Sequence, residues 1–99
     1  MKVLKFKVSG QSLVPVDIPD DIAPGTRGYL RCEFDITGES SWTGCSLIAE
    51  FNGDEAVMVR NGRCNVPDSI ASRTIFKVKL YGLRGKRYRI VTNDVVVKL

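Results

Sequence analysis

Hydrophobic and polar residues alternate along most of this chain with a period of two, which is typical of β-strands. In residues 74–81, for example, Phe76 and Val78 alternate with Lys77. The segments that show this alternation are 2–8, 28–35, 46–51, 74–81 and 87–98. The last of them is interrupted at residues 92–94, which predicts a bulge or a change of sheet within one long terminal strand.

Turn-forming residues separate these predicted strands. A short strand over residues 56–60 leads into Asn61-Gly62, a strong hairpin signal because both residue types tolerate a positive φ. Two further hairpin turns are expected, at residues 52–54 and 82–86. Prolines at positions 15, 19 and 24 break up residues 9–26, which we interpret as an irregular loop containing one edge strand. Residues 67–72 form the only helix-like stretch, about one turn long.

The pattern predicts an all-β fold. About seven short strands at roughly ten-residue spacing favour an immunoglobulin-like antiparallel β-sandwich. One sheet alone would leave an apolar face in water, so two sheets or a closed barrel are required. A chain of 99 residues suits one modest core, and we expect a single β-sandwich domain over residues 1–99.

Cysteine usage bears on how the two sheets are held together. Cys32, Cys45 and Cys64 include no C-x-x-C pair, and the chain has no histidine to complete a zinc site. An odd count in a chain without a signal peptide favours reduced, buried thiols over a disulfide. We therefore expect no inter-sheet disulfide, no metal and no cofactor.

The net charge of +4 conceals two blocks of opposite sign. Residues 17–55 carry nine acidic residues against two basic ones, and residues 73–99 carry eight basic residues against Asp94 alone. Such blocks suit either cross-strand pairing within one molecule or head-to-tail contact between copies. A protein built to bind nucleic acid less often carries so acidic a half.

Catalysis is disfavoured by the residue types present. The absence of histidine removes the commonest general base and metal ligand. The carboxylates fall on outward strand positions and turns, and no phosphate-binding glycine motif occurs. We expect a protein that is not an enzyme.

The start of the chain and its apolar runs bear on localisation. Residues 1–10 alternate lysine with apolar residues, whereas a signal peptide has an unbroken apolar segment and a cleavage site, so none is expected. Apolar runs are too short to span a bilayer, and no membrane partner is expected.

The most distinctive local feature is the basic segment at residues 83–89. It could contact phosphate or an acidic partner. The alternative is a solvated hairpin tip whose charges protect a sheet edge, and Tyr88 is expected to face inward. Tyr29 and Tyr81 occupy outward positions that suit a contact surface. The candidate binding residues are Arg84, Lys86, Arg87, Arg89 and Tyr81.

Four short motifs follow one another along residues 28–98. They are a W-x-G at residues 42–44, an aromatic-ended strand at 49–51, a C-x-V-P segment at 64–67 and a T-N-x-V-V ending at 92–96. In this order they resemble immunoglobulin-like modules of tailed-phage and prophage structural proteins, of the baseplate, tail or head-fibre type.

The resemblance implies a virion component, made in the host cytoplasm and held by other virion proteins or by copies of itself. It supplies no catalytic residues. The positions that carry over from it are structural only: Trp42, Phe51, Val66, Pro67 and Gly82. For Trp42 the core is favoured over an exposed anchor for a partner, because a small sandwich without a disulfide needs apolar bulk.

Two other functions stay open. One is a basic module that contacts nucleic acid or an anionic polymer through the hairpin at residues 84–89. The other is an adhesion module for surface glycans, which requires exposed aromatic residues near Trp42.

Overall fold

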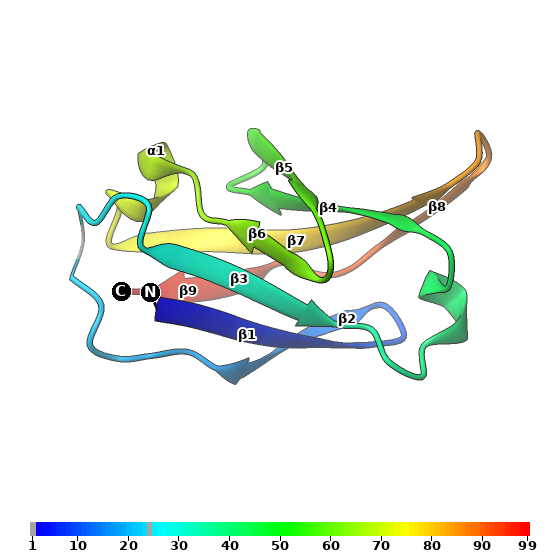
Figure 1. Ribbon diagram of the computed structural model, residues 1–99, viewed down its shortest axis with the longest axis horizontal. Coiled ribbons are helices and arrows are strands. Elements are labelled where there is room, and N and C mark those ends of the chain that lie inside the picture. Colours follow the sequence, from blue (N-terminus) through cyan, green and yellow to red (C-terminus); the bar gives the residue numbers. More distant parts are fainter. Residues whose placement is uncertain (1, 24) are drawn as a thin grey trace.

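The computed structural model describes residues 2–23 and 25–99. Its strands are β1 (Lys2–Ser9), β2 (Ser12–Asp17), β3 (Leu30–Asp35), β4 (Ser46–Phe51), β5 (Glu55–Val59), β6 (Arg63–Asn65), β7 (Ile75–Arg84), β8 (Tyr88–Val91) and β9 (Val95–Lys98). Sheet A has the strand order β2-β1-β3-β6, and sheet B has the order β5-β4-β7-β8 with β9 also paired to β7. The two sheets form two layers, and the β7–β8 hairpin extends past them at one end (Figure 1).

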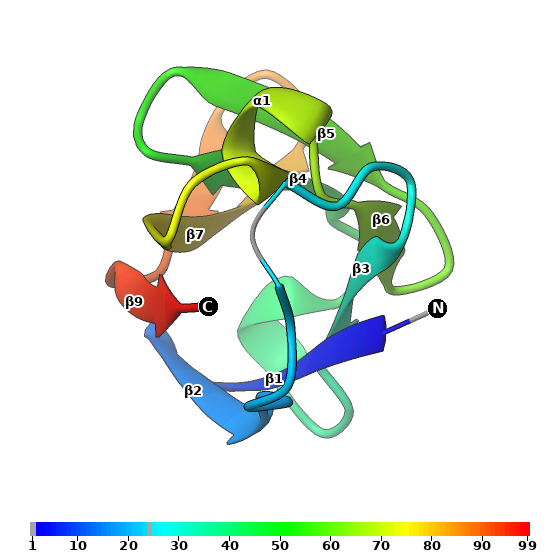
Figure 2. The same cartoon turned by 90° about the vertical axis from the view of Figure 1, so that its left-hand side faces the viewer.

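Two short helical turns connect the strands: η1 (Ser40–Trp42) and α1 (Asp68–Ala71). The expected turn at residues 67–72 is therefore confirmed, but the expectation that it is the only helical stretch is wrong, because η1 is a second one. Figure 2 looks onto the end where β1 begins and β9 ends, and α1 lies at this end on the side of sheet B. None of the described helices is long and apolar enough to cross a membrane.

The expected all-β sandwich is confirmed, because alternate side chains of both sheets face one core. Phe6 and Phe34 stack across sheet A with ring centroids 5.4 Å apart, and Phe51 and Phe76 pack across sheet B at 6.1 Å. Such aromatic pairs contribute large buried areas at favourable ring geometries. The largest fully buried side chain is Trp42.

The strand count and one pairing differ from the sequence-based expectation. The described residues contain nine strands rather than about seven. Most neighbours are antiparallel as expected, but β1 and β3 are parallel, with Leu4 opposite Cys32. The reason is the connection: β2 turns back along β1, and residues 18–29 then return to the end where β1 begins. A parallel pair needs such a crossover of about a dozen residues.

β2 lies within the segment 9–26 and forms an edge of sheet A. Its register against β1 shifts between Lys5 and Phe6, where Pro15 is the partner. Proline has no N–H to donate, so an edge strand tolerates it. Pro24, in the same segment, lies outside the described residues.

Hydrogen bonds join the two sheets along both long edges. On one side, Arg60 and Arg63 exchange backbone bonds of 2.9 and 3.0 Å around the Asn61-Gly62 turn. Both turn residues have positive φ (53° and 74°), as this hairpin type requires. On the other side, Asn93 accepts a bond from the backbone N–H of Leu13 at 2.8 Å through Oδ1.

The predicted interruption at residues 92–94 is confirmed, since β8 ends at Val91 and β9 begins at Val95. It is not a change of sheet, because both strands pair with β7 in sheet B. Thr92 is buried there, and its Oγ1 accepts a 3.0 Å bond from the backbone N–H of Leu80. Because of this break, the side chain of Asn93 can hydrogen-bond to β2. The hydroxyl of Thr92 meanwhile accepts the bond from the backbone N–H of Leu80 on β7.

Candidate interaction surfaces

The outer face of sheet A carries a ladder of alternating charge. Asp17, Lys5, Glu33 and Arg63 are successive cross-strand partners on β2, β1, β3 and β6. Arg63 Nε lies 3.6 Å from Glu33 Oε2. Opposite charges at such positions attract, so this part of the acidic block is balanced within the molecule. The cations that balance it come from β1 and β6 rather than from residues 73–99.

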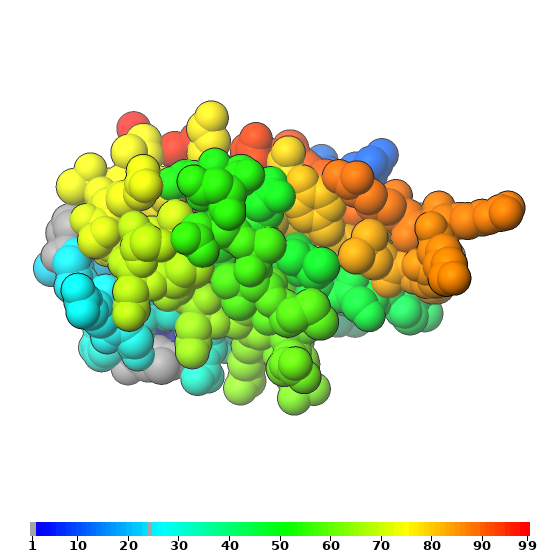
Figure 3. Space-filling model, turned by 90° about the horizontal axis from the view of Figure 1, so that it is seen from above, coloured from blue at the N-terminus to red at the C-terminus, as the bar shows by residue number. Residues whose placement is uncertain are grey.

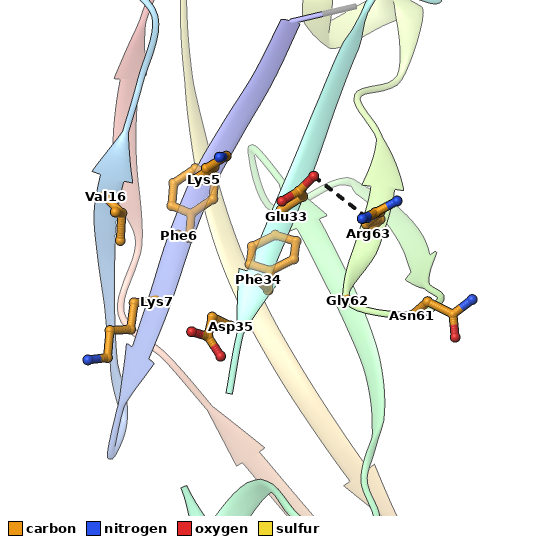
Figure 4. A pocket seen from close by; sticks show the side chains of 10 residues that line it. All are labelled: Lys5, Phe6, Lys7, Val16, Glu33, Phe34, Asp35, Asn61, Gly62 and Arg63. Carbon is orange, nitrogen blue, oxygen red and sulfur yellow. Dashed lines mark ion pairs between the residues drawn. The ribbon is translucent and has the colours of Figure 1, made fainter. Parts of the chain in front are cut away.

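A shallow groove of about 400 Å³ crosses this face. Figure 4 shows Lys5 and Lys7 on one side of it, Arg63 on the other, and the carboxylates of Glu33 and Asp35 between them. Each cation therefore has an acid nearby. A groove of this kind favours no single sign of charged ligand.

The outer face of sheet B carries an apolar row instead. Met58, Ile48, Tyr81 and Val91 are successive cross-strand partners on β5, β4, β7 and β8. Met58 is 51% exposed, and the other three side chains are half-buried. A shallow hollow of about 330 Å³ lies over this row. The residues that line the hollow are Ile48, Glu50, Ala56, Tyr81, Leu83 and Arg89.

Tyr81 lies in the middle of this apolar row and contacts a charged residue on each neighbouring strand. Its hydroxyl donates a 3.2 Å hydrogen bond to Glu50 Oε1 on β4. The guanidinium carbon of Arg89 on β8 lies 4.9 Å from the centre of its ring, within reach of a cation–π interaction. Tyrosine and arginine are among the residue types that contribute most to binding at protein interfaces.

The basic residues of the candidate binding set lie at three different positions on the β7–β8 hairpin: its tip, its outer side and its inner side. Lys86 and Arg87 lie at its exposed tip and form no ion pair with any other residue that the structure describes. Residues near the tip, orange in Figure 3, project beyond the rest of the molecule. Arg89 faces the outer side of sheet B, beside Tyr81.

Arg84 is committed to the inner side of this hairpin. Its Nη1 donates to the backbone oxygen of Thr43 at 2.7 Å, and its guanidinium lies 4.2 Å from the ring centre of Tyr88. Tyr88 is half-buried, and its hydroxyl donates to the backbone oxygen of Ser41 at 2.7 Å. Arg84 and Tyr88 thus connect the base of the hairpin to η1 and the residue after it. The guanidinium of Arg84 is engaged within the molecule by this contact.

The hairpin turn lies later than the sequence predicts, because Gly82 stays within β7. Trp42 packs directly onto it: a Cβ at Gly82 would lie 2.8 Å from Trp42 Cε3. Trp42 is fully buried, and its Nε1 donates a 2.8 Å bond to the backbone oxygen of Gly10. The tryptophan is therefore a core residue, and the glycine is the close-approach site that it needs.

The other structural positions also lie in or next to the core. Phe51 and Val66 are buried, and Pro67 precedes α1. The three cysteines are free, with Cys32 and Cys64 buried and Cys45 half-buried.

The described part of the chain places no three histidine, cysteine or acidic side chains together in a way that could hold a metal. Its geometry defines an all-β sandwich with two unlike outer faces, one with a row of alternating charges and one with an apolar row between charged residues. Comparisons with models of protein families, with curated proteins and with solved structures found no match.

Proposed function

We propose that this protein is a non-enzymatic structural module that acts through protein–protein contacts, above all with a second copy of itself. The observation that carries this proposal is the apolar row on the solvent side of sheet B. An antiparallel sheet with one solvated face usually places polar residues on that face. A contiguous apolar strip with a charged rim is instead typical of an interaction surface.

Two of the charges around Tyr81, Glu50 and Arg89, favour a second copy as the occupant; the third, Lys79, is the cross-strand partner of Glu50 and lies 3.9 Å from Asp94. Glu50 lies on β4, one cross-strand row to one side of Tyr81, and Arg89 lies on β8, one row to the other side. The two charges are therefore diagonal across the tyrosine. A two-fold axis in the plane of the interface then brings Glu50 of each copy to the arginine of the other. Such self-complementarity is what a symmetric dimer interface requires.

The setting that we propose is a tailed-phage virion, as a head-fibre, decoration or tail and baseplate component, with other virion proteins as further partners. This part rests on the motif resemblance to immunoglobulin-like modules. The two-sheet sandwich agrees with those modules in outline, and the parallel β1–β3 pair departs from an all-antiparallel arrangement.

The test is the mass in solution, by light scattering on a size-exclusion column at low and high salt. We expect a dimer at both salt concentrations, because burial of apolar area does not depend on charge screening. Met58→Glu and Tyr81→Ser should both produce monomers that keep the wild-type circular dichroism spectrum.

Val14→Glu is the matched control, since Val14 is also exposed (45%) but lies on the edge strand of sheet A. It should remain dimeric. A wild-type protein that is monomeric at both salt concentrations, even when concentrated, would contradict the self-association proposal.

The unpaired tip of the hairpin supports a second candidate, a module that contacts nucleic acid or an anionic polymer through Lys86 and Arg87. The geometry counts against it, because only two of the four basic side chains share one surface. The test is fluorescence anisotropy with labelled DNA and the Lys86→Ser/Arg87→Ser double variant. Phosphate binding should weaken steeply with salt and in the variant. An affinity that the double variant leaves unchanged would reject this candidate.

A further inference from the structure

Cys32 and Cys64 are direct cross-strand partners on β3 and β6. On one side of them the backbone N–H of Val66 donates to Leu30, and on the other side that of Phe34 donates to Gly62. Because bonded pairs alternate along an antiparallel ladder, the two cysteines occupy a hydrogen-bonded pair, whose Cα atoms are about 5.5 Å apart. A disulfide bridges Cα separations of roughly 4.4–6.8 Å. The Cα atoms of such a pair are therefore within the range that a disulfide spans, and the Cβ atoms, which stand about 4.5–5.5 Å apart across antiparallel strands, must move closer for the bond to form.

The two thiols differ in their access to solvent. Cys32 is fully buried, whereas Cys64 keeps 7% exposure and lines a hollow of about 450 Å³ where β5 and β6 diverge. No acidic residue that the structure describes lines the same hollow, but three arginines do, namely Arg31, Arg60 and Arg63. Cys64 is therefore the thiol of the pair that lies closer to solvent, beside arginines of which Arg63 is paired with Glu33.

The interaction between the thiols also distinguishes them. A hydrogen bond with Cys32 lowers the pKa of Cys64, although partial burial acts in the opposite direction. The same hydrogen bond and complete burial both raise the pKa of Cys32. Cys64 is thus the thiol that more readily becomes a thiolate, and Cys32 is the protonated thiol behind it.

We infer that Cys64 and Cys32 form a reversible dithiol–disulfide pair, with Cys64 as the site that hydrogen peroxide oxidises. The Cys64 thiolate attacks one peroxide oxygen, the O–O bond breaks, and the departing hydroxide takes up a proton to become water. Cys64 is then a sulfenic acid. Cys32 Sγ attacks the Cys64 sulfur, the S–O bond breaks, and the hydroxide leaves as water with the Cys32 proton. Two thiols are oxidised, one peroxide is reduced to two waters, and an added dithiol reverses the bond.

The bond would link the short edge strand β6 to β3 and close the loop that contains β4 and β5. Such a cross-link restricts the unfolded chain and stabilises the folded one. We expect the oxidised protein to melt about 10 °C higher than the reduced protein.

The experiment treats the reduced protein with a small excess of hydrogen peroxide, unfolds it in guanidinium with N-ethylmaleimide, and measures the intact mass. Reduced protein takes up three labels, one for each cysteine. Oxidised protein should take up one label, on Cys45, and peptide mapping should find residues 32 and 64 linked. Dithiothreitol should restore three labels.

The variants assign the roles. Cys45→Ala is the matched control and should still form the bond, whereas Cys64→Ala should not. Cys32→Ala should stop at a sulfenic acid on Cys64, which dimedone traps. If a buried alanine at position 32 prevents folding, the wild-type label count still decides. Three labels after peroxide, sulfinic acid on Cys64 beside a free Cys32, or links only between chains would each overturn the inference.

Discussion

The outer faces of the two sheets are unlike, although their inner faces are equally apolar. On sheet A, cations and anions alternate from strand to strand, as in the pair Lys5 and Glu33. On sheet B, the corresponding row runs through Ile48 and Tyr81 without a charge. Sheet A does expose Val14 and Val16, but both lie on the edge strand β2, where Lys7 is the partner of Val14.

The difference lies in which outer face leaves a row of apolar side chains in contact with water. On sheet A the row of Asp17, Lys5, Glu33 and Arg63 alternates in sign, so cross-strand attraction and water satisfy these charges. On sheet B the apolar row gains free energy only when something covers it. One sandwich therefore carries one outer face with a row of alternating charges and one with an exposed apolar row, which the proposed self-association would cover.

The largest expected effect comes from truncating a large side chain in the core between the two sheets. Trp42→Ala deletes the fully buried ring that packs on Gly82 and leaves a cavity behind it. We expect the free energy of unfolding to fall by about 3–5 kcal/mol, with loss of both faces together. Urea denaturation followed by circular dichroism measures it.

Tyr29→Ala is the control for this substitution, since Tyr29 is 44% exposed. It should change the free energy of unfolding by no more than about 0.5 kcal/mol. A Trp42→Ala variant as stable as this control would show that the tryptophan does not support the sandwich.

A smaller effect should come from reversing one charge on sheet A. Glu33→Lys places a cation between Lys5 and Arg63, so that three like charges stand in one row. We expect a loss of about 1 kcal/mol in the free energy of unfolding at low salt, and a smaller loss at high salt because the charges are screened.

Glu33→Gln is the matched neutral variant and should cost only a few tenths of a kcal/mol. Neither change should alter the proposed dimer, because Glu33 lies on the face away from the apolar row. Dissociation in either variant would mean that sheet A takes part in association, and the contrast between the two faces would fail.

Much of the fold could be predicted from local alternation, because burial on one face imposes a period of two. Segments 46–51 and 74–81 are strands with the predicted inward residues. The three-residue strand β6 has a single buried residue, too few to show a period. The parallel β1–β3 pair depends on the path of residues 18–29, which no local pattern records.

The candidate surfaces were only partly predictable for the same reason. Alternation places Tyr81 on the outward side of its strand, but Ile48 and Met58 join it through pairings between distant segments. The opposition of Cys32 and Cys64 likewise depends on register across 32 residues of chain. A turn predicted at residues 82–86 groups Arg84 with the tip, whereas Gly82, on which Trp42 packs, stays within β7.

The smallest effect, a change in one carboxyl pKa, tests whether charges beside sheet A are balanced locally. Lys2 Nζ lies 2.7 Å from Asp21 Oδ2, and this hydrogen bond lowers the pKa of Asp21. The pKa of Asp35 is also lowered, but by hydrogen bonds from Thr37. Lys2→Met should therefore return the pKa of Asp21 to its ordinary range and leave that of Asp35 low, as carbon-detected NMR titration can measure.

The lowered pKa of Asp21 has a defined sign in its effect on stability. Because the folded pKa lies below the unfolded value of about 3.9, the contribution is present above that pH and is lost as the pH falls through the folded pKa. Lys2 has a raised pKa, so its contribution is lost only as the pH rises through that folded value. The Asp21 shift should also shrink in high salt, since both groups are exposed, whereas a shift of Asp35 that depends on hydrogen bonds should persist. If Lys2→Met moved both carboxyl groups equally, the lowering would come from the overall positive charge of the protein rather than from local pairing.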